Sequence, residues 1–570
     1  MRWIVIVLLA ILLAPPASAQ DVTFTIIPKT LQLIPRDASN SGEIRVSGSV
    51  HAAGHDSVRL DIHRNGTVWR SVRAPLRYEN GIAPFDLSAR IPAELAEFDI
   101  RIFLDGALVA WRPHIVCGDV YLASGQSNAQ TLGGYAYRNE FIRSFGSSLN
   151  SPDALADTTW GLAQAQTALA HLAVGTWEME MGKVLIETCG VPVAILNGAL
   201  GGTLIAQHFR NDAAPMDPNT LYGRLLWRAA KAGVQHEINA ILWHQGESDT
   251  GANWLDYRES FARLLNAWRE DFAQQKIYVF QIHPGCGSDF QSQLREVQRT
   301  QPEHFDNVEV MATVGLAGHD GCHYSIDGYR QMGRWISHLV AHDFYGESDT
   351  LDIRAPNVQR IWLSSPPQDE LRIQFDCAVS WPADTLGIAL EDYIYLDGAA
   401  GAVVDGRVDD LDPRTLVLTL NGPSNATRVT YLPNLTNDLG DNYEGPFIRG
   451  RRGVGALTFF EFPIMDPAGV PPGAGASVIP PIEIAPNPFL DHAEVRFTLP
   501  RAEAVCIEIL DAAGRVVRVL SDRALPAGPH AIPLGAMLDS RRGRLPAGLY
   551  FVRCRTGSGI ELHAKAMRLR

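Results

Sequence analysis

The chain has 570 residues and a formal net charge of −14, from 49 Lys and Arg against 63 Asp and Glu. This balance argues against a nucleic-acid binder, which needs clustered Lys and Arg to neutralise phosphates. The 46% content of hydrophobic residues excludes a chain that is disordered throughout. At about 150 residues per domain, the length predicts roughly four domains.

The first 19 residues have the features of an export signal. Arg2 gives a positive start, residues 3–13 are apolar, and Ala17-Ser18-Ala19 is a small-residue cleavage site. The apolar stretch is too short to span a membrane, and no later stretch is long enough. We therefore expect a protein without a membrane span that is secreted or held at the cell surface.

Residues 20–111 alternate apolar and polar side chains over short runs at 44–46, 58–62 and 98–103. Alternation with a period of two is typical of strands that are buried on one face only. The sequence therefore predicts an N-terminal β-sandwich.

Between residues 112 and 346 the pattern changes to alternating strands and helices. Helical spacing of apolar residues predicts helices at 177–188, 257–272 and 327–340. Continuous apolar runs predict strands buried on both faces, as in a parallel sheet covered by helices. These runs are 120–123, 191–196, 238–243, 277–282 and 308–314. In such an α/β core, reactive residues collect at the carboxyl ends of the strands.

Each predicted strand is followed by polar residues or glycines. In chain order these segments are Ser124–Asn128, Asn197–Thr203, His244–Asp249, His283–Cys286 and His319–His323. They include a Ser in a Gly-flanked turn, a late His, a nearby carboxylate and Gly-rich backbone donors. Acyl transfer needs this set of groups.

Chemical roles can be assigned within this set. Ser127 is the candidate nucleophile, although a helix cap is an alternative role for it. His323 is the candidate base, because Asp320 lies three residues earlier in a Gly-rich turn and can orient the imidazole. Three other histidines are rivals for the role of base, namely His244, His283 and His319.

The oxyanion of the reaction needs donors that are fixed in advance. The backbone N–H groups of Ser127 and of Gly201 or Gly202 are candidates, with the Gln245 side chain as a third donor. Glu247 is either a second acid behind His323 or a buried partner of the serine turn. His and Asp at these spacings can also bind zinc, but there is no HExxH and no Cys pair. We therefore expect no metal and no cofactor.

Four blocks together resemble those of SGNH-type esterases, with the sialate O-acetylesterase and carbohydrate esterase family 6 branch as the nearest group. The blocks are Gly125–Asn128, Gly201–Thr203, Trp243–Asp249 and Asp320–His323. Over about 230 residues, the resemblance implies a flavodoxin-like three-layer fold and metal-free hydrolysis of O-acetyl esters on sugars.

The resemblance also implies roles for single residues. Ser127 is then the nucleophile, His323 the base and Asp320 the triad acid, and Glu247 shares the acid role as in some relatives. The chain departs from the family pattern at Leu200 and Tyr324, and we expect both to line the acyl or sugar pocket.

The remaining sequence predicts further β modules. Residues 351–465 carry strand patterns at 371–375, 416–420 and 457–462, and residues 466–481 form a Pro/Gly linker. Residues 482–570 predict a second sandwich, with strands at 495–499, 506–510 and 550–555. This region resembles the C-terminal sorting domain of type IX secretion substrates. The resemblance implies that the type IX secretion machinery is a partner of the protein. The resemblance rests on Pro486–Phe489, Asp511–Arg515, Leu545–Tyr550 and the basic tail 565–570.

Seven cysteines are scattered along the chain. In an oxidising compartment, Cys286 with Cys322 and Cys506 with Cys554 are plausible disulfide pairs, and the odd count leaves at least one free thiol or an intermolecular bridge. The sequence alone does not fix the connectivity. The full pattern favours a secreted serine esterase that acts on acetylated glycans. A non-catalytic carbohydrate-binding or adhesion protein is the alternative, and a serine protease is a third interpretation.

Overall fold

The computed structural model describes two compact units, residues 1–467 and 468–570, which we treat separately. The predicted export signal (1–19) and linker (466–481) lie outside the described residues. Described are residues 21–569 except 52–53, 132, 149–151, 167–169, 274–275, 287–288, 365–366, 385–386, 435–442, 466–481, 488, 491, 500–502, 512–515, 527, 535–545 and 557–560.

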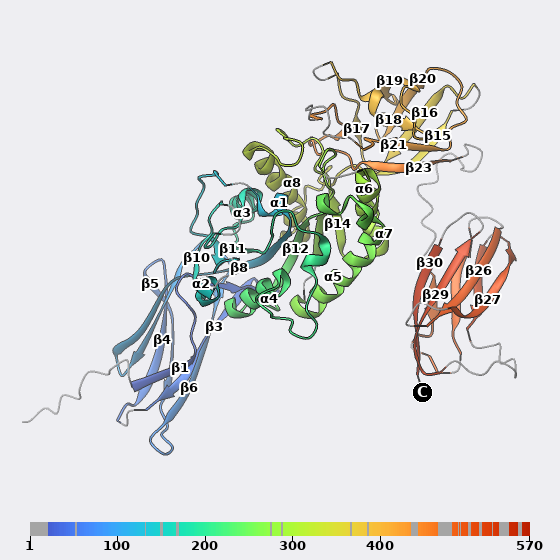
Figure 1. Cartoon of the computed structure of the whole chain (residues 1–570). Coiled ribbons are helices and arrows are strands. Elements are labelled where there is room, and N and C mark those ends of the chain that lie inside the picture. Colours follow the sequence, from blue (N-terminus) through green and yellow to red (C-terminus); the bar gives the residue numbers. More distant parts are fainter. Residues whose placement is uncertain are drawn as a thin grey trace, which may run out of the picture. The chain divides into compact units, whose positions relative to one another are not determined.

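The first unit begins with an all-β module of two sheets (Figure 1). One sheet has the order β1-β3-β6, and the other has the order β5-β4-β7-β8. Alternate side chains of both sheets fill one shared apolar core. The bounds are β1 Val22–Ile26, β2 Leu33–Pro35, β3 Ser41–Val50, β4 Ser57–Arg64, β5 Thr67–Pro75, β6 Ala83–Pro92, β7 Phe98–Leu104 and β8 Ala107–Gly125. The runs predicted at 44–46, 58–62 and 98–103 lie in β3, β4 and β7.

Strand β8 is 19 residues long and belongs to both the N-terminal module and the central parallel sheet. The predicted domain boundary at 111/112 therefore lies inside a strand. Burial explains why the sequence pattern changes there. Residues 107–114 are partly exposed, whereas 115–125 are buried on both faces, and the positive φ of His114 marks the transition.

The central sheet has the order β10-β9-β11-β8-β12-β13-β14. Five of its parallel strands, β11-β8-β12-β13-β14, have the order 2-1-3-4-5 of a flavodoxin-like sheet, while β9 extends the parallel pairing beyond β11 and β10 is antiparallel to β9. The five predicted strands are thus confirmed, while the short β9 and β10 were not predicted. The bounds are β9 Ile142–Phe145, β10 Trp160–Leu162, β11 Val193–Asn197, β12 Ile238–His244, β13 Lys276–Phe280 and β14 Val308–Met311.

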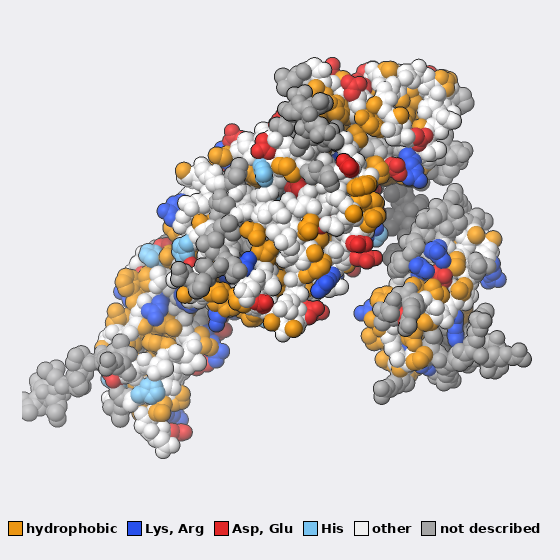
Figure 2. Space-filling model, in the orientation of Figure 1, with side chains coloured by type: hydrophobic (Ala, Val, Ile, Leu, Met, Phe, Trp, Pro, Cys, Tyr) orange, Lys and Arg blue, Asp and Glu red, His pale blue; other side chains and the backbone are white. Residues whose placement is uncertain are grey.

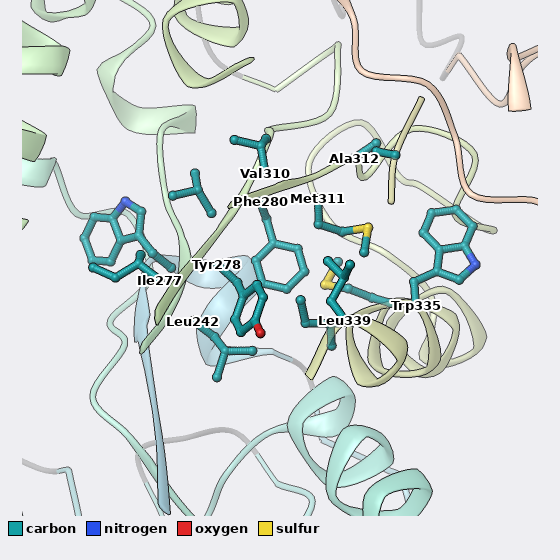
Figure 3. Close-up of a cluster of buried hydrophobic side chains, with 14 of the residues drawn as sticks. Leu242, Ile277, Tyr278, Phe280, Val310, Met311, Ala312, Trp335 and Leu339 are labelled. Atoms are coloured by element: carbon teal, nitrogen blue, oxygen red, sulfur yellow. The ribbon is translucent and has the colours of Figure 1, made fainter. Parts of the chain in front are cut away.

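Helices cover both faces of this sheet (Figure 1). Helices α3 (Thr176–Cys189), α5 (Tyr257–Phe272) and α8 (Ile326–Tyr345) confirm the three predicted helices, and α4 (Leu221–Ala232) was not predicted. Side chains of β13 and β14 pack against Trp335 and Leu339 of α8 (Figure 3). No helix in the described ranges combines the length and hydropathy needed for a membrane span. The shorter helices are α1 Ser127–Gln130, α2 Pro152–Ala156, α6 Gln291–Arg299 and α7 Gln301–His304, with 3₁₀ turns at 205–208, 247–249, 252–256 and 390–393.

A second β module packs on the central domain. Its seven-stranded sheet has the order β18-β21-β23-β15-β16-β20-β19, and its apolar side chains join the core of the parallel sheet. Arg295 of α6 is fully buried at this junction, where its Nε donates to Thr458 Oγ1 at 2.9 Å. The bounds are β15 Val358–Leu363, β16 Glu370–Phe375, β17 Val379–Ser380, β18 Ile394–Leu396, β19 Val403–Val408, β20 Thr415–Leu420, β21 Arg428–Tyr431, β22 Arg449–Gly450 and β23 Phe459–Met465.

The second unit is also all-β, with sheets β24-β25-β28 and β27-β26-β29-β30 around its own core. The expected Cys506–Cys554 disulfide is not formed. Cys506 lies opposite Arg555, and Cys554 lies opposite Ile507, so the two sulfurs point to opposite faces of the sheet. The bounds are β24 Glu483–Ala485, β25 Glu494–Leu499, β26 Glu503–Leu510, β27 Val516–Leu525, β28 Gly528–Pro533, β29 Gly548–Thr556 and β30 Glu561–Arg568.

Glycines in α8 and α3 differ in how much space surrounds them. A Cβ at Gly333 of α8 would lie 2.4 Å from the backbone oxygen of Trp177, whereas a Cβ at Gly182 of α3 would meet only side-chain atoms, the nearest at 3.2 Å. We expect Gly333→Ala to lower the free energy of unfolding by about 1–3 kcal/mol. Gly182→Ala should be close to neutral, because improved helix propensity offsets the tighter contact. Urea unfolding of both variants checks this expectation, and equal stabilities would contradict it.

Candidate active site

The serine turn lies where β8 ends, between the ends of β11 and β12. Gly125 has a φ of 134°, and a Cβ there would lie 2.0 Å from the His244 carbonyl oxygen, so the position requires glycine. Its own carbonyl accepts from the N–H of Leu200 at 3.0 Å. Ser127 then begins the four-residue helix α1 and remains partly exposed. This edge is the switch point of the sheet, where α/β proteins bind their ligands.

Gln126 fixes the turn from behind. Its side-chain oxygen accepts from the N–H groups of Gly246 (3.3 Å) and Ser248 (3.2 Å), and from the Gln245 amide (3.2 Å). Its own N–H donates to the His244 carbonyl at 2.9 Å. The WHQGESD block therefore holds the serine turn through backbone groups and the Gln245 side chain.

Asn128 joins the serine turn to the histidine loop. Its Nδ2 donates to Glu247 Oε1 at 2.7 Å and to the carbonyl oxygen of Cys322 at 2.9 Å, while its Oδ1 accepts from the hydroxyl of Tyr329 at 2.8 Å. The side chain is almost fully buried, so water does not compete for these hydrogen bonds. The link thus connects the residue after Ser127 to the residue before His323.

The loop that carries His323 is ordered by Asp320. Asp320 Oδ1 accepts from the N–H groups of His323 (2.6 Å) and Cys322 (2.9 Å), and its Oδ2 lies 3.8 Å from His323 Nδ1. Burial alone would raise the pKa of Asp320, but these N–H groups and the neighbouring histidines lower it. Asp320 thus presents a carboxylate near Nδ1 of the partly exposed His323 imidazole.

A disulfide fixes the same loop from the other side. Cys286, after β13, is bonded to Cys322 with a Cα–Cα separation of 4.6 Å. This confirms one of the two expected pairs. Together with Asn128, the bond holds Cys322 at both its side chain and its carbonyl oxygen, directly before His323.

The rival histidines are buried and serve packing. His283 and His319 stack with ring centroids 3.8 Å apart, and His244 stacks on Phe280. Burial lowers the pKa of His319 to about 4 and holds the pKa of His283 well below its ordinary value. Both rings are therefore neutral near pH 7, and of these histidines only His323 reaches solvent, with a side chain 36% exposed.

Glu247 is a partner of the serine turn and not of His323. Its Oε1 lies 3.4 Å from His244 Nε2 and accepts from Asn128. Among the described contacts none joins it to His323. Burial raises its pKa, but the hydrogen bond and charge of His244 and the bond from Asn128 outweigh that effect and lower the pKa. Of the two roles that the sequence left open, the structure supports the buried partner.

Two of the groups expected to donate hydrogen bonds to the oxyanion are already engaged elsewhere in the structure. The N–H of Gly201 donates to Gln130 Oε1 at 2.7 Å, and the fully buried Gln245 amide donates to Gln126, Thr203 and Asp249, so neither is free. The N–H groups of Ser127 and Gly202 make no hydrogen bond within the described part of the chain. They are the two donors that remain available to a ligand.

Two positioning residues carried no sequence signal of their own. Asn197, the last residue of β11, donates to the carbonyl oxygens of Ala129 (2.7 Å) and Val174 (3.0 Å) and so fastens α1 to the sheet. Tyr329 of α8 orients Asn128. In the sequence, only their positions point to a role in the site: Asn197 ends a predicted strand, and Tyr329 lies in the helix that follows His323.

The two residues that depart from the family pattern, Tyr324 and Leu200, differ in how deeply they are buried. Tyr324 is buried among the rings of His283, His319 and Tyr329, so the expectation that it lines an open pocket is wrong. Leu200 is half-buried beside the serine turn. The described side chains contain no group of three or more His, Cys, Asp or Glu arranged to hold a metal ion.

Comparison with known proteins finds a family that the central domain resembles. Residues 117–342 match a family model described as "Carbohydrate esterase, sialic acid-specific acetylesterase". This stretch contains the flavodoxin-like sheet and the serine turn at its switch point. The central domain is thus similar to carboxylic ester hydrolases and, more narrowly, to carbohydrate esterases.

Two individual proteins are similar to this chain. The first, "Probable carbohydrate esterase At4g34215" of Arabidopsis thaliana, is 26% identical over 167 residues, which are 28% of this chain and 59% of that protein. The chain thus matches little more than half of that relative. The second, XAC1771 of Xanthomonas citri, is described as a novel carbohydrate acetylesterase. It has a TM-score of 0.52 at 18% identity, over 77% of this chain and 99% of that structure. This likeness shows a shared fold that extends beyond residues 117–342.

The disulfide predicts a measurable effect on activity. We expect the double variant Cys286→Ser/Cys322→Ser to lose about 10²-fold in kcat on an acetate ester, because His323 loses one fixed point and small misplacements are costly. Stability should fall by about 4 kcal/mol, the chain-entropy value for a loop of this size. Cys189→Ser, which removes a thiol at the end of α3, is the control. Unchanged kcat in a folded double variant would contradict this role.

Glu247 predicts a dependence of stability on pH. Its folded pKa lies below the ordinary value of 4.5, so between the two values the unfolded chain binds a proton that the folded chain does not. Its stabilisation is therefore complete above the unfolded pKa and is lost as the pH falls through the folded pKa. We expect the free energy of unfolding to fall more steeply in acid for the wild type than for Glu247→Gln. Glu259→Gln, on the exposed face of α5, is the charge-matched control and should follow the wild type.

Proposed function

We propose that the protein is a serine esterase that hydrolyses O-acetyl esters on carbohydrates. The observation that supports the proposal is the Asn128 link, which joins the turn of the partly exposed Ser127 to the loop of the partly exposed His323. The family match of residues 117–342 supports an acetylated sugar as the substrate.

The residues support acyl transfer in two steps. Ser127 Oγ attacks the acetyl carbonyl carbon while His323 takes the hydroxyl proton, and Asp320 stabilises the imidazolium that forms. The N–H groups of Ser127 and Gly202 stabilise the oxyanion. His323 then returns the proton to the departing sugar oxygen, which leaves an acetyl-enzyme. Water, deprotonated by His323, releases acetate and restores Ser127.

The Asp320 carboxylate is 65% exposed and lies 3.8 Å from the ring, longer than a hydrogen bond. Contacts of this kind shorten when a substrate binds. In this proposal Asp320 fixes the loop first, through its two backbone bonds, and orients the imidazole second.

The proposal includes export of the enzyme. The signal-like residues 1–19 and the C-terminal unit, with its sorting-type motifs, support secretion or display at the cell surface through type IX machinery. The Cys286–Cys322 disulfide is in keeping with an oxidising compartment.

The Ser127→Ala variant tests the reaction. We expect it to release acetate from acetylated sialic acid, acetylated xylan or a chromogenic acetate more than about 10³-fold more slowly than the wild type, because no other group supplies the nucleophile. A fluorophosphonate should label the wild type once, and this variant not at all. Ser248→Ala, which changes the serine of the WHQGESD block, should keep its activity and its label.

The outcomes separate the possible functions. Full activity of a folded Ser127→Ala protein would overturn the assignment of the nucleophile. Glycan binding by the wild type without turnover or labelling would instead identify a non-catalytic binding protein. The substrate panel shows which sugar carries the acetyl group.

A further inference from the structure

The outer face of the β5-β4-β7-β8 sheet has a composition unlike the rest of this acidic chain. Directly paired residues of an antiparallel sheet point to the same face. One row across this face contains Arg73, Arg59, Phe103 and Leu108, and the next contains Ser71, Asp61, Arg101 and Trp111. The residues between them, such as Leu60 and Ile102, are fully buried in the module's core.

The face is open to solvent. Trp111 is 51% and Leu108 is 54% exposed, two of the larger exposed apolar side chains of the unit. The neighbouring β5 residues are exposed as well. Figure 2 shows Lys and Arg side chains beside hydrophobic ones over the N-terminal strands. Apolar surface of this kind, mixed with charge, marks a site of interaction.

The charge on the face is positive, with three arginines against Asp61. Arg59 is already engaged, with its guanidinium 4.5 Å from the centre of the Phe103 ring and 3.1 Å from Asp61. Arg73 donates to Ser57 Oγ. Arg101 makes no hydrogen bond or ion pair within the described residues. The next carboxylate along the strand, Asp99, accepts from the N–H of His114.

We propose that this face, centred on Arg101 and Trp111, is a binding site for an anionic glycan whose sugars carry carboxylates. The two residues are cross-strand neighbours, and such pairs have Cβ atoms about 4.5–5.5 Å apart. A single sugar ring can lay its C–H face on the Trp111 indole, whose ring face is electronegative, while its carboxylate pairs with the unengaged Arg101 guanidinium. The catalytic crevice, at the other end of β8, is a separate site.

The observations favour a glycan over other occupants. A single exposed indole with one unengaged arginine suits one carboxylate per sugar ring, whereas the closely spaced phosphates of a nucleic acid require a larger cluster of Lys and Arg. Only the choice of an acidic sugar rests on the proposed function. The face itself is defined by its own residues.

The test uses the full chain with Ser127→Ala, so that binding is measured without turnover. Isothermal titration and affinity electrophoresis with polysialic acid and polygalacturonate, and with neutral dextran, give the Kd values. We expect binding of at least one acidic polymer, weakened by added salt, and no binding of dextran. Trp111→Ala and Arg101→Gln should each raise the Kd at least about tenfold. Arg45→Gln, an equal charge change on the other sheet of the module, should leave the Kd unchanged.

Each outcome decides the proposal. An unchanged Kd in both Trp111→Ala and Arg101→Gln, absence of binding to either acidic polymer, or equal binding of dextran would overturn it. A dimer that Trp111→Ala converts to a monomer in light scattering would show that a second copy covers the face, and would also overturn it. Acetate release by the wild type is measured separately, so failure of the esterase proposal leaves the binding result interpretable. Thermal unfolding confirms that the variants are folded.

Discussion

The buried amide of Asn128 is the interaction on which the candidate site depends. In a setting closed to water, its amide hydrogens and its oxygen must be matched by protein groups, and the matches come from three different elements. Glu247 follows β12, Cys322 precedes His323, and Tyr329 belongs to α8. A residue without a nucleophilic or basic group thus connects the turn of Ser127 to the loop of His323. Removing its side chain would take one hydrogen bond each from a buried carboxylate, a carbonyl and a hydroxyl.

The site is built mostly from backbone contacts among strand ends. Gly125 packs on the His244 carbonyl, Leu200 donates to Gly125, and Gln126 gathers three N–H and amide donors. Such contacts depend on the sheet and not on mobile side chains, which is why a half-exposed serine and histidine keep their places. The disulfide adds a covalent constraint to the loop that carries His323. The module after residue 351 supports this edge further, because Phe447 contacts the ring of His283.

Much of this could be predicted from the sequence. Continuous apolar runs located the five parallel strands, and the polar residues after them located the crevice, because strand ends follow directly from the pattern of burial. Strand β9 (Ile-Arg-Ser-Phe) has polar residues at both central positions, so neither a continuous apolar run nor a strict alternation marks it in the sequence. The bonding of Gln245 and Gly201 could not be predicted, since it depends on which neighbour reaches each donor in three dimensions. The Cys506–Cys554 pairing failed for a similar reason: proximity of two strands does not reveal on which face each sulfur lies.

The continuity of β8 has a consequence for how a polymer would be processed. From Trp111 to Gly125 the strand advances 125 − 111 = 14 residues, at most about 46 Å at 3.3 Å per residue. Trp111 and Gly125 belong to one strand, so the distance between the proposed binding face and the serine turn is fixed. A glycan bound at Trp111 would keep its neighbouring sugars within that distance of the serine turn. Anchoring then converts each later encounter into an intramolecular one with a high effective concentration. Acetyl groups several sugars away from the anchored unit would benefit from this tether, and short free sugars would not.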